Sequence, residues 1–308
     1  MSARLKRVIV DRLSERFLAD GGMSDSRHGT FRADSTGWGI LALSAGGGNK
    51  DVIESHRKRL IRAQDEAGGV FIDNKHVEAH WPTALAVLAW QNSLECGHAR
   101  ENAIQFLLRT TGVRASNQSN GPFAHDLALK GWPWIDGTHS WIEPTALSII
   151  ALKSTTYDRH KRVHEAVEMI LNRQLPHGGW NYGNTLVFGR ELRPMPESTG
   201  AALAGLAGLV DENSVAKSLS YLRDEVDRLN TPISVGWTLL GLAAWGNWPS
   251  SSPTLVERCL ARQSRYGDYG TSALSLLLLG ALAGSEDGKK LPLMPPKGDR
   301  NAPATLHG

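Results

Sequence analysis

The sequence contains little cysteine and little excess charge. Only Cys96 and Cys259 occur among its 308 residues, which is too few for a disulfide framework or a multi-cysteine zinc site. The 34 basic and 31 acidic residues leave a formal net charge of +3, so the composition gives no sign of nucleic-acid binding. We therefore expect a cytoplasmic protein without a nucleic-acid partner.

Long hydrophobic runs are also missing. The most apolar segment, residues 273–283, is far shorter than the roughly 20 residues that cross a bilayer, and we expect it to be a buried helix. The N-terminal segment has no apolar stretch of signal-peptide length. Residues 285–308 are rich in Gly, Pro and charge, which predicts a largely irregular tail after a single domain over residues 1–284.

The sequence does contain a short pattern that recurs ahead of six apolar segments, at residues 34, 81, 143, 197, 233 and 269. Each apolar segment is rich in Ala and Gly and apolar almost all round, which indicates a helix buried on most sides. A charged, amphipathic segment precedes each pattern and indicates an outer helix with one solvated face. Six such alternations predict an all-α (α/α)6 toroid of six inner and six outer helices. A superhelical solenoid of helix pairs is the structural alternative.

Three predicted outer helices end in a similar motif. The segment from Gln174 to Trp180 satisfies Q-x3-G-x-W in full, and the segments that start at Gln64 and Gln263 keep the Gln and the Gly. A Gly at this place permits the left-handed conformation that ends many helices. The motif resembles the QW repeat of squalene and oxidosqualene cyclases, so the chain is similar to single-domain, bacterial-type members of the terpenoid-cyclase and protein-prenyltransferase superfamily. The resemblance spans about residues 4–283, and it implies that each Gln ties an outer helix to the next inner helix.

The catalytic motifs of that superfamily are incomplete in this sequence. Terpenoid cyclases of class II protonate their substrate with a D-x-D-D-T-A motif, which does not occur here. Placing Thr145 on the Thr of that motif puts Glu143 at the acid position, and Glu197 and Asp34 fall there in two other repeats. The Asp, Cys and His that hold zinc in prenyltransferases have no counterpart at the matching spacing. We therefore expect neither a metal nor a cofactor; His76 and His80 lack a third ligand.

Aromatic residues gather in the loop from Gly131 to Trp141, where they could line a pocket or form a lid over the ring. The candidate catalytic residues are Glu143, Glu197 and an acid/base pair of Asp136 and His139. The alternative for both glutamates is a favourable negative charge at a helix N-terminus. The candidate substrate-binding residues are Asp34, Trp81, Trp132, Trp134, Trp141, Trp180, Tyr182, Phe188, Trp237 and Tyr269.

Three functions are compatible with these residues. The resemblance implies a cyclase-like enzyme that holds an isoprenoid or polyprenyl lipid in the central cavity, with Glu143 as acid or base. Peripheral contact with a membrane would give such a protein access to its lipid. The first alternative is a non-catalytic toroid that binds a lipid or a partner. The second is a carbohydrate-active (α/α)6 enzyme in which Glu143 and Glu197 work as paired carboxylates.

Overall fold

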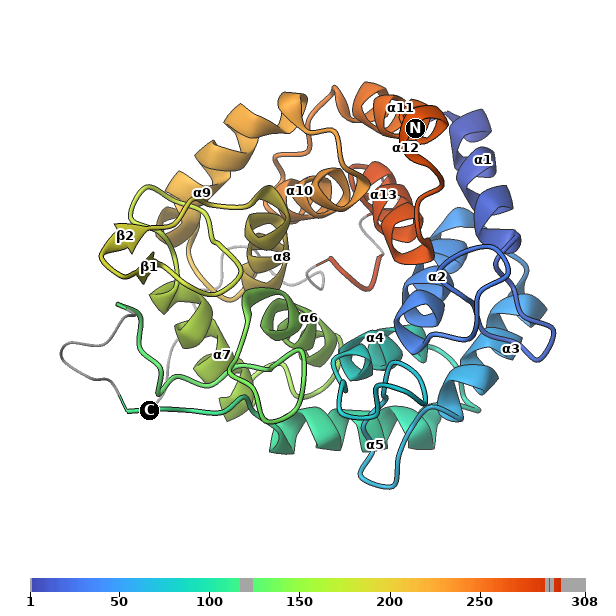
Figure 1. Ribbon diagram of the computed structural model, residues 1–308, viewed down its shortest axis with the longest axis horizontal. Coiled ribbons are helices and arrows are strands. Elements are labelled where there is room, and N and C mark those ends of the chain that lie inside the picture. Colours follow the sequence, from blue (N-terminus) through green and yellow to red (C-terminus); the bar gives the residue numbers. More distant parts are fainter. Residues whose placement is uncertain (1, 117–123, 286–287, 289–290, 295–308) are drawn as a thin grey trace.

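The computed structural model describes residues 2–116, 124–285, 288 and 291–294, and their helices alternate between two concentric rings (Figure 1). The outer ring consists of α1 (Ala3–Ser14), α3 (Lys50–Ile61), α5 (Gly97–Arg109), α7 (Lys161–Asn172), α9 (Glu212–Glu225) and α11 (Ser252–Ala261). The inner ring consists of α2 (Ala33–Gly46), α4 (Pro82–Ala89), α6 (Ile142–Lys153), α8 (Pro196–Leu206), α10 (Pro232–Ala244) and α13 (Thr271–Ala283). The minor elements are η1 (Val226–Arg228), α12 (Gln263–Tyr266) and the hairpin of β1 (Leu186–Val187) and β2 (Arg190–Glu191).

The inner ring is closed. Each inner helix packs against the inner helix before and after it, and α13 packs against α2. Hydrogen bonds complete the closure, because the Thr271 amide donates to the Asp25 carbonyl at 2.9 Å and the Thr271 hydroxyl donates to the Ser24 carbonyl at 2.6 Å. The first and last repeats of an open solenoid do not meet in this way. The predicted (α/α)6 toroid is therefore confirmed.

Small residues let neighbouring inner helices approach closely. A Cβ atom on Gly200 of α8 would lie 2.3 Å from the Trp237 carbonyl oxygen of α10. A Cβ atom on Gly241 of α10 would lie 2.6 Å from the Gly200 carbonyl oxygen. Real side chains do not tolerate such distances, so the Gly and Ala content of the apolar segments is a requirement of the ring.

The recurring threonine of the sequence pattern has a structural role in four repeats. Its hydroxyl lies in the first turn of an inner helix and accepts a hydrogen bond from a backbone N–H of the loop that precedes the helix, at 2.8–3.0 Å. The pairs are Thr36 with Met23, Thr83 with Val70, Thr145 with Trp132, and Thr199 with Trp180. In these four repeats the threonine therefore anchors the loop that leads into the inner helix. All four loops lie at one end of the ring, which we call the mouth.

The glutamines of the QW-like motifs connect two outer helices. The Gln64 amide donates to the Ala99 carbonyl of α5 at 2.8 Å, and the Gln174 amide donates to Ser218 Oγ of α9 at 2.7 Å. The predicted tie to the next inner helix is wrong for these two residues, because their bonds outside their own loop go to the following outer helix; within the described residues, Gln263 bonds only to Leu260 and Tyr269, nearby in the sequence. The motif is structural, as its position at a helix end suggested.

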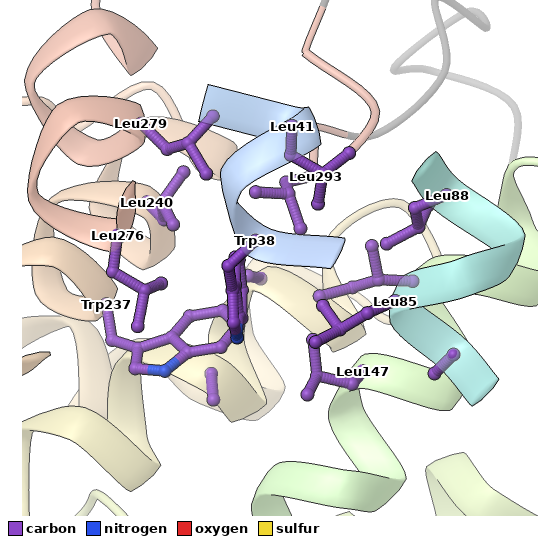
Figure 2. Close-up of a cluster of buried hydrophobic side chains, with 14 of the residues drawn as sticks. Trp38, Leu41, Leu85, Leu88, Leu147, Trp237, Leu240, Leu276, Leu279 and Leu293 are labelled. Atoms are coloured by element: carbon purple, nitrogen blue, oxygen red, sulfur yellow. The ribbon is translucent and has the colours of Figure 1, made fainter. Parts of the chain in front are cut away.

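Side chains fill the middle of the ring (Figure 2). The rings of Trp38 and Trp237 meet edge to face at 5.6 Å, and leucines from α2, α4, α6, α10 and α13 surround them. Leu293, from the segment expected to be an irregular tail, joins this cluster and is 1% exposed. Residues 295–308 of that tail lie outside the described residues.

The side chains in the middle of the ring argue against the predicted lipid cavity. A central space wide enough for a polyene would leave its lining side chains accessible, yet Trp38 and Trp237 are 3% and 4% exposed. The burial of Trp237 is at odds with its predicted substrate contact. Among the helices of the described chain, none is both long and apolar enough to span a bilayer.

Candidate functional site

Carboxyl groups stand at the N-termini of three inner helices, at the mouth of the ring. Asp34 lies in the first turn of α2, Glu143 in that of α6 and Glu197 in that of α8. Asp34 is engaged by the Arg32 guanidinium through two hydrogen bonds, of 3.0 and 2.7 Å. This bidentate ion pair occupies both carboxylate oxygens, so it argues against the predicted role of Asp34 in binding substrate.

Glu143 is buried, with 7% of its surface exposed, and no basic side chain is paired with it among the described residues. The Ser198 hydroxyl donates to its Oε1, while its Oε2 has no hydrogen-bond partner among the described residues. Burial raises the pKa of Glu143 to about 7; the nearby charge of Glu197 acts in the same direction, and the Ser198 hydrogen bond opposes it. A large fraction of Glu143 is therefore protonated near neutral pH and can act as an acid.

Glu197 has a more polar environment than Glu143. The Ser234 hydroxyl donates to its Oε2 at 2.8 Å, and the Tyr182 hydroxyl donates to its Oε1 at 3.4 Å. Burial and the charges of both glutamates raise the pKa of Tyr182, which keeps its phenol protonated as a donor. Because α6 and α8 are neighbours in the inner ring, we call Glu143 and Glu197 the carboxyl pair.

A pocket of about 330 Å³ lies beside α6, on the side away from α8. We call it the side pocket. Trp81 forms part of its wall and packs edge to face against Trp134 at 4.9 Å. The pocket is lined by His80, Trp81, Phe106, Leu107, Arg109, Thr110, Thr111, Trp132, Pro133, Asp136, Gly137, Pro144 and Ser148. The aromatic loop of residues 131–141 therefore forms a wall of this pocket.

The structure gives Asp136 a different partner from the predicted one. Its carboxylate contacts Nδ1 of His80 at 2.8 Å, whereas His139 stacks on Trp141 with ring centres 4.4 Å apart. The predicted pair of Asp136 and His139 is wrong, because the backbone of the loop turns the two side chains toward different neighbours. Burial and the charge of Arg173 lower the pKa of His139.

His76 and His80 do not share a ligand site. His76 contacts Asp73 at 2.8 Å, and His80 contacts Asp136 and Asp65. Within residues 2–116, 124–285, 288 and 291–294, no group of three or more His, Cys, Asp or Glu side chains could hold a metal ion.

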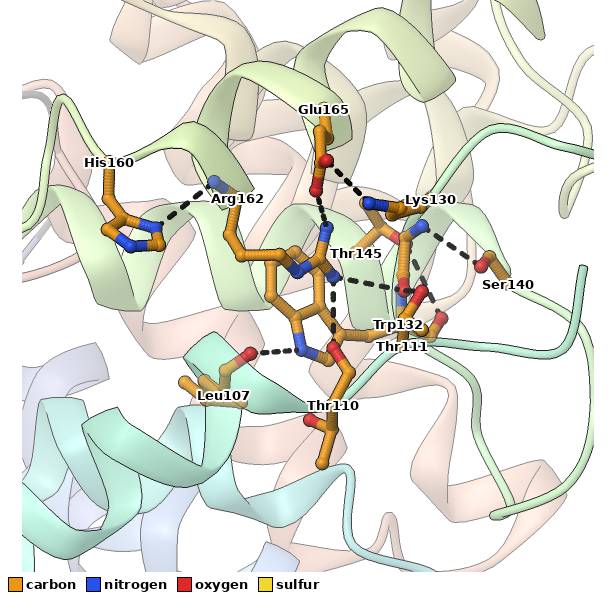
Figure 3. Close-up of polar contacts among 11 residues, drawn as sticks. Leu107, Thr110, Thr111, Lys130, Trp132, Ser140, Thr145, His160, Arg162 and Glu165 are labelled. Atoms are coloured by element: carbon orange, nitrogen blue, oxygen red, sulfur yellow. Dashed lines mark hydrogen bonds and ion pairs between the residues drawn. The ribbon is translucent and has the colours of Figure 1, made fainter.

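Several predicted substrate-binding aromatics serve the packing of the fold. Figure 3 shows Trp132 between α5 and α7: its indole N–H donates to the Leu107 carbonyl at 3.1 Å and the Arg162 guanidinium lies 4.0 Å above its ring. The indole of Trp180 is fully buried and donates to the Ile170 carbonyl at 2.7 Å. The complete burial of Trp180 argues against a direct substrate contact, whereas Trp132 is 4% exposed and lines the side pocket.

The remaining aromatics differ in position. The Tyr269 hydroxyl donates to the Cys259 carbonyl at 2.8 Å, away from both the carboxyl pair and the lining of the side pocket. Phe188 is 84% exposed at the turn between β1 and β2. Of the predicted binding residues, Trp81 and Trp132 line the side pocket, Trp134 packs against Trp81, and Tyr182 donates to Glu197.

The sequence analysis did not name Asp65 or Ser198, and it considered His80 only as a metal ligand. Ser198 directly follows Glu197 in the recurring pattern, so its position offered a signal. Asp65 and His80 come from separate turns of the second repeat, and only the folded ring brings them to Asp136.

Known structures resemble this fold at low sequence identity. An α-amylase from Clostridium perfringens superposes with a TM-score of 0.62 at 11% identity, covering 91% of this chain and 98% of that one. An inactive variant of an α-1,6-mannanase from Salegentibacter sp., in complex with α-1,6-mannotriose, gives the same TM-score, identity and coverage. A protein from Actinoplanes gives a TM-score of 0.59 at 15% identity, covering 92% and 98% of the two chains. No protein-family model matches the sequence, and no curated protein is significantly similar to it. At these identities the likeness establishes the toroid fold.

Proposed function

We propose that this protein is a carbohydrate-active toroid that binds a saccharide across its mouth and hydrolyses it with the carboxyl pair. The observation that carries the proposal is the contrast between two carboxyls on neighbouring helices. Glu143 is buried, with a pKa raised to about 7, whereas Glu197 is hydrogen-bonded by two hydroxyl groups. Glycoside hydrolysis uses such a pair, one carboxyl as acid and the other as base or nucleophile.

The roles follow from the two environments. Protonated Glu143 gives its proton to the oxygen of the leaving sugar as the bond from that oxygen to the anomeric carbon breaks. Glu197 takes a proton from a water molecule, whose oxygen forms the new bond to the anomeric carbon. The two carboxyls end with exchanged protonation, and a proton returns to Glu143 through solvent before the next cycle.

A carbohydrate suits this protein better than the isoprenoid that the QW-like motifs imply. An isoprenoid needs a dry interior, and Trp38, Trp237 and Leu293 occupy the middle of this ring. The mouth, in contrast, combines carboxyls, hydroxyls and aromatic rings, which suit a ligand with many hydroxyl groups. Two of the solved structures that resemble this fold are named as an α-amylase and an α-1,6-mannanase, which supports this choice.

The test is hydrolysis of a panel of α- and β-linked gluco- and manno-oligosaccharides, followed by mass spectrometry of the products. We expect at least one member to be cleaved by the wild-type protein, and the rate to fall about a hundredfold or more in Glu143→Gln and Glu197→Gln. The matched control is Glu191→Gln, which removes an exposed carboxyl of β2 and should leave the rate unchanged.

Two results would reject the proposal in different ways. If no saccharide is cleaved but some are bound, the toroid is a carbohydrate-binding protein and the acid role of Glu143 is wrong. If none is cleaved or bound, while a polyprenol or prenyl diphosphate is bound or converted, the carbohydrate assignment itself is wrong.

A further inference from the structure

The side pocket holds a second polar cluster that takes no part in the carboxyl pair. The ring of His80 stands between two carboxylates, with Nδ1 at 2.8 Å from Asp136 Oδ2 and Nε2 at 3.0 Å from Asp65 Oδ2. Each ring nitrogen is therefore within hydrogen-bond distance of one carboxylate oxygen. The side chain of His80 is 12% exposed and that of Asp136 is 52% exposed. The cluster thus connects a shielded imidazole to a carboxylate that solvent or a ligand can reach.

Both ends of this cluster are held by the backbone. Asp65 accepts a hydrogen bond from the Gly69 N–H through its second oxygen, at 2.8 Å. The Asp136 N–H donates to the Glu78 carbonyl, also at 2.8 Å. The loops of the second and third repeats are therefore joined at Asp136 through its side chain and its backbone. Such double fixing keeps the carboxylate in place before a ligand arrives.

Aromatic rings complete the pocket beside this carboxylate. Trp81 is braced by Trp134, and Phe106 lies 5.2 Å from the ring of His80. A sugar ring offers an apolar C–H face to an aromatic ring and hydroxyl groups at its edge to an acceptor. The volume of about 330 Å³ is near the lower limit of ligand pockets, so it suits one or two sugar rings better than a long apolar chain.

The position of the side pocket relative to the carboxyl pair gives it a role. Pro144 and Ser148 of α6, four residues apart and so on one face of the helix, line the pocket. Glu143 contacts Ser198 of α8, on the other side of α6. A chain-like ligand that crosses the N-terminus of α6 can therefore occupy the pocket with one unit and reach the carboxyl pair with the next.

We propose that the side pocket is a binding subsite for one sugar ring of the saccharide, stacked on Trp81 and hydrogen-bonded through its hydroxyl groups to Asp136. His80 is a positioning residue that orients Asp136, and Asp65 orients His80. This subsite rests on the proposed function, because it takes a unit of the ligand on which the carboxyl pair acts.

The test is isothermal titration of α-1,6-mannotriose and of maltotriose into the full chain carrying Glu143→Gln, which keeps the shape of the side chain and removes the proposed acid. We expect one triose to bind, and Asp136→Ala or Trp81→Ala, added to this background, to weaken its Kd about tenfold or more. Trp81→Phe keeps an aromatic face and should retain most of the affinity. It also serves as the control if Trp81→Ala does not fold.

The positioning role has its own control. His80→Asn should weaken binding when Asp136 is present and should add no further loss to Asp136→Ala, since coupled residues are not additive. His76→Asn removes a comparable contact, between His76 and Asp73 at 2.8 Å, that does not line the pocket. It should leave the Kd unchanged. Additive losses in the double variant would overturn the positioning role of His80.

The outcomes separate this proposal from the proposed function. If a triose binds and neither Asp136→Ala nor Trp81→Ala weakens it, the subsite is refuted and the carboxyl pair stands. If neither triose binds, the subsite is also refuted. The hydrolysis panel on the wild-type protein then decides whether the proposed function falls with it.

Discussion

The buried position of Glu143 predicts a specific pH dependence of stability. Its pKa in the folded protein is about 7, compared with about 4.3 for an unfolded Glu. Because the folded pKa is the higher one, the folded state binds the proton more tightly. The stabilising contribution is therefore complete below about pH 4 and is lost as the pH rises through about 7.

The magnitude follows from the shift in pKa. Each unit corresponds to about 1.4 kcal/mol, so ionisation of Glu143 reduces the free energy of unfolding by roughly 2–3 kcal/mol between about pH 5 and pH 8. Gln has nearly the same shape, can accept from the Ser198 hydroxyl and does not ionise. We therefore compare the free energy of unfolding of Glu143→Gln with that of the wild type at each pH. We expect the difference, in favour of Glu143→Gln, to be larger at about pH 8 than at about pH 5 by roughly 2–3 kcal/mol.

Urea denaturation of both proteins across this pH range measures the effect directly. Glu191→Gln removes an exposed carboxyl of β2 and should keep the pH dependence of the wild type. If the stability difference between Glu143→Gln and the wild type stays constant within about 0.5 kcal/mol over the range, Glu143 does not titrate near neutral pH. The reasoning that makes it an acid would then be refuted.

Three further substitutions test what holds the ring together, each by urea denaturation or thermal melting. Leu293→Ala should cost about 2–5 kcal/mol, because it leaves a cavity among the central side chains; no change would mean that Leu293 does not fill the ring in solution. Thr145→Val should cost about 1–3 kcal/mol, since the buried Trp132 N–H loses its acceptor. Lys153→Met should cost a similar amount, because its amine donates to the carbonyls of Ala204 and Ala207 at the end of α8. Unchanged stability in either of the last two would contradict the roles given to these bonds.

The alternation of helix types made the architecture predictable. Inner helices such as α2 are buried almost all round, whereas α7 buries only one face, and both properties can be read from the spacing of apolar residues. The small residues of the inner segments are explained by close helix packing at Gly200 and Gly241. The apolar spacing and the small residues are local features of the sequence. Because they recur six times, they predict the fold.

The candidate site was only partly predictable. Glu143 and Glu197 could be named because each holds a fixed place in the recurring pattern, in the first turn of an inner helix. The contact between His80 and Asp136 joins residues 56 positions apart in two loops, and no periodicity connects them. Trp132 and Trp134 are two residues apart, yet the first is bonded into the fold and the second braces the side pocket. Such assignments depend on tertiary contacts.

We propose that ligand binds across the mouth, over α6 and α8, and not inside the ring. A crystal structure of Glu143→Gln with whichever triose binds would show where the ligand lies. We predict electron density for a sugar chain at the N-termini of α6 and α8, with one ring against Trp81. Density for a ligand between Trp38 and Trp237, with Leu293 displaced, would contradict the account.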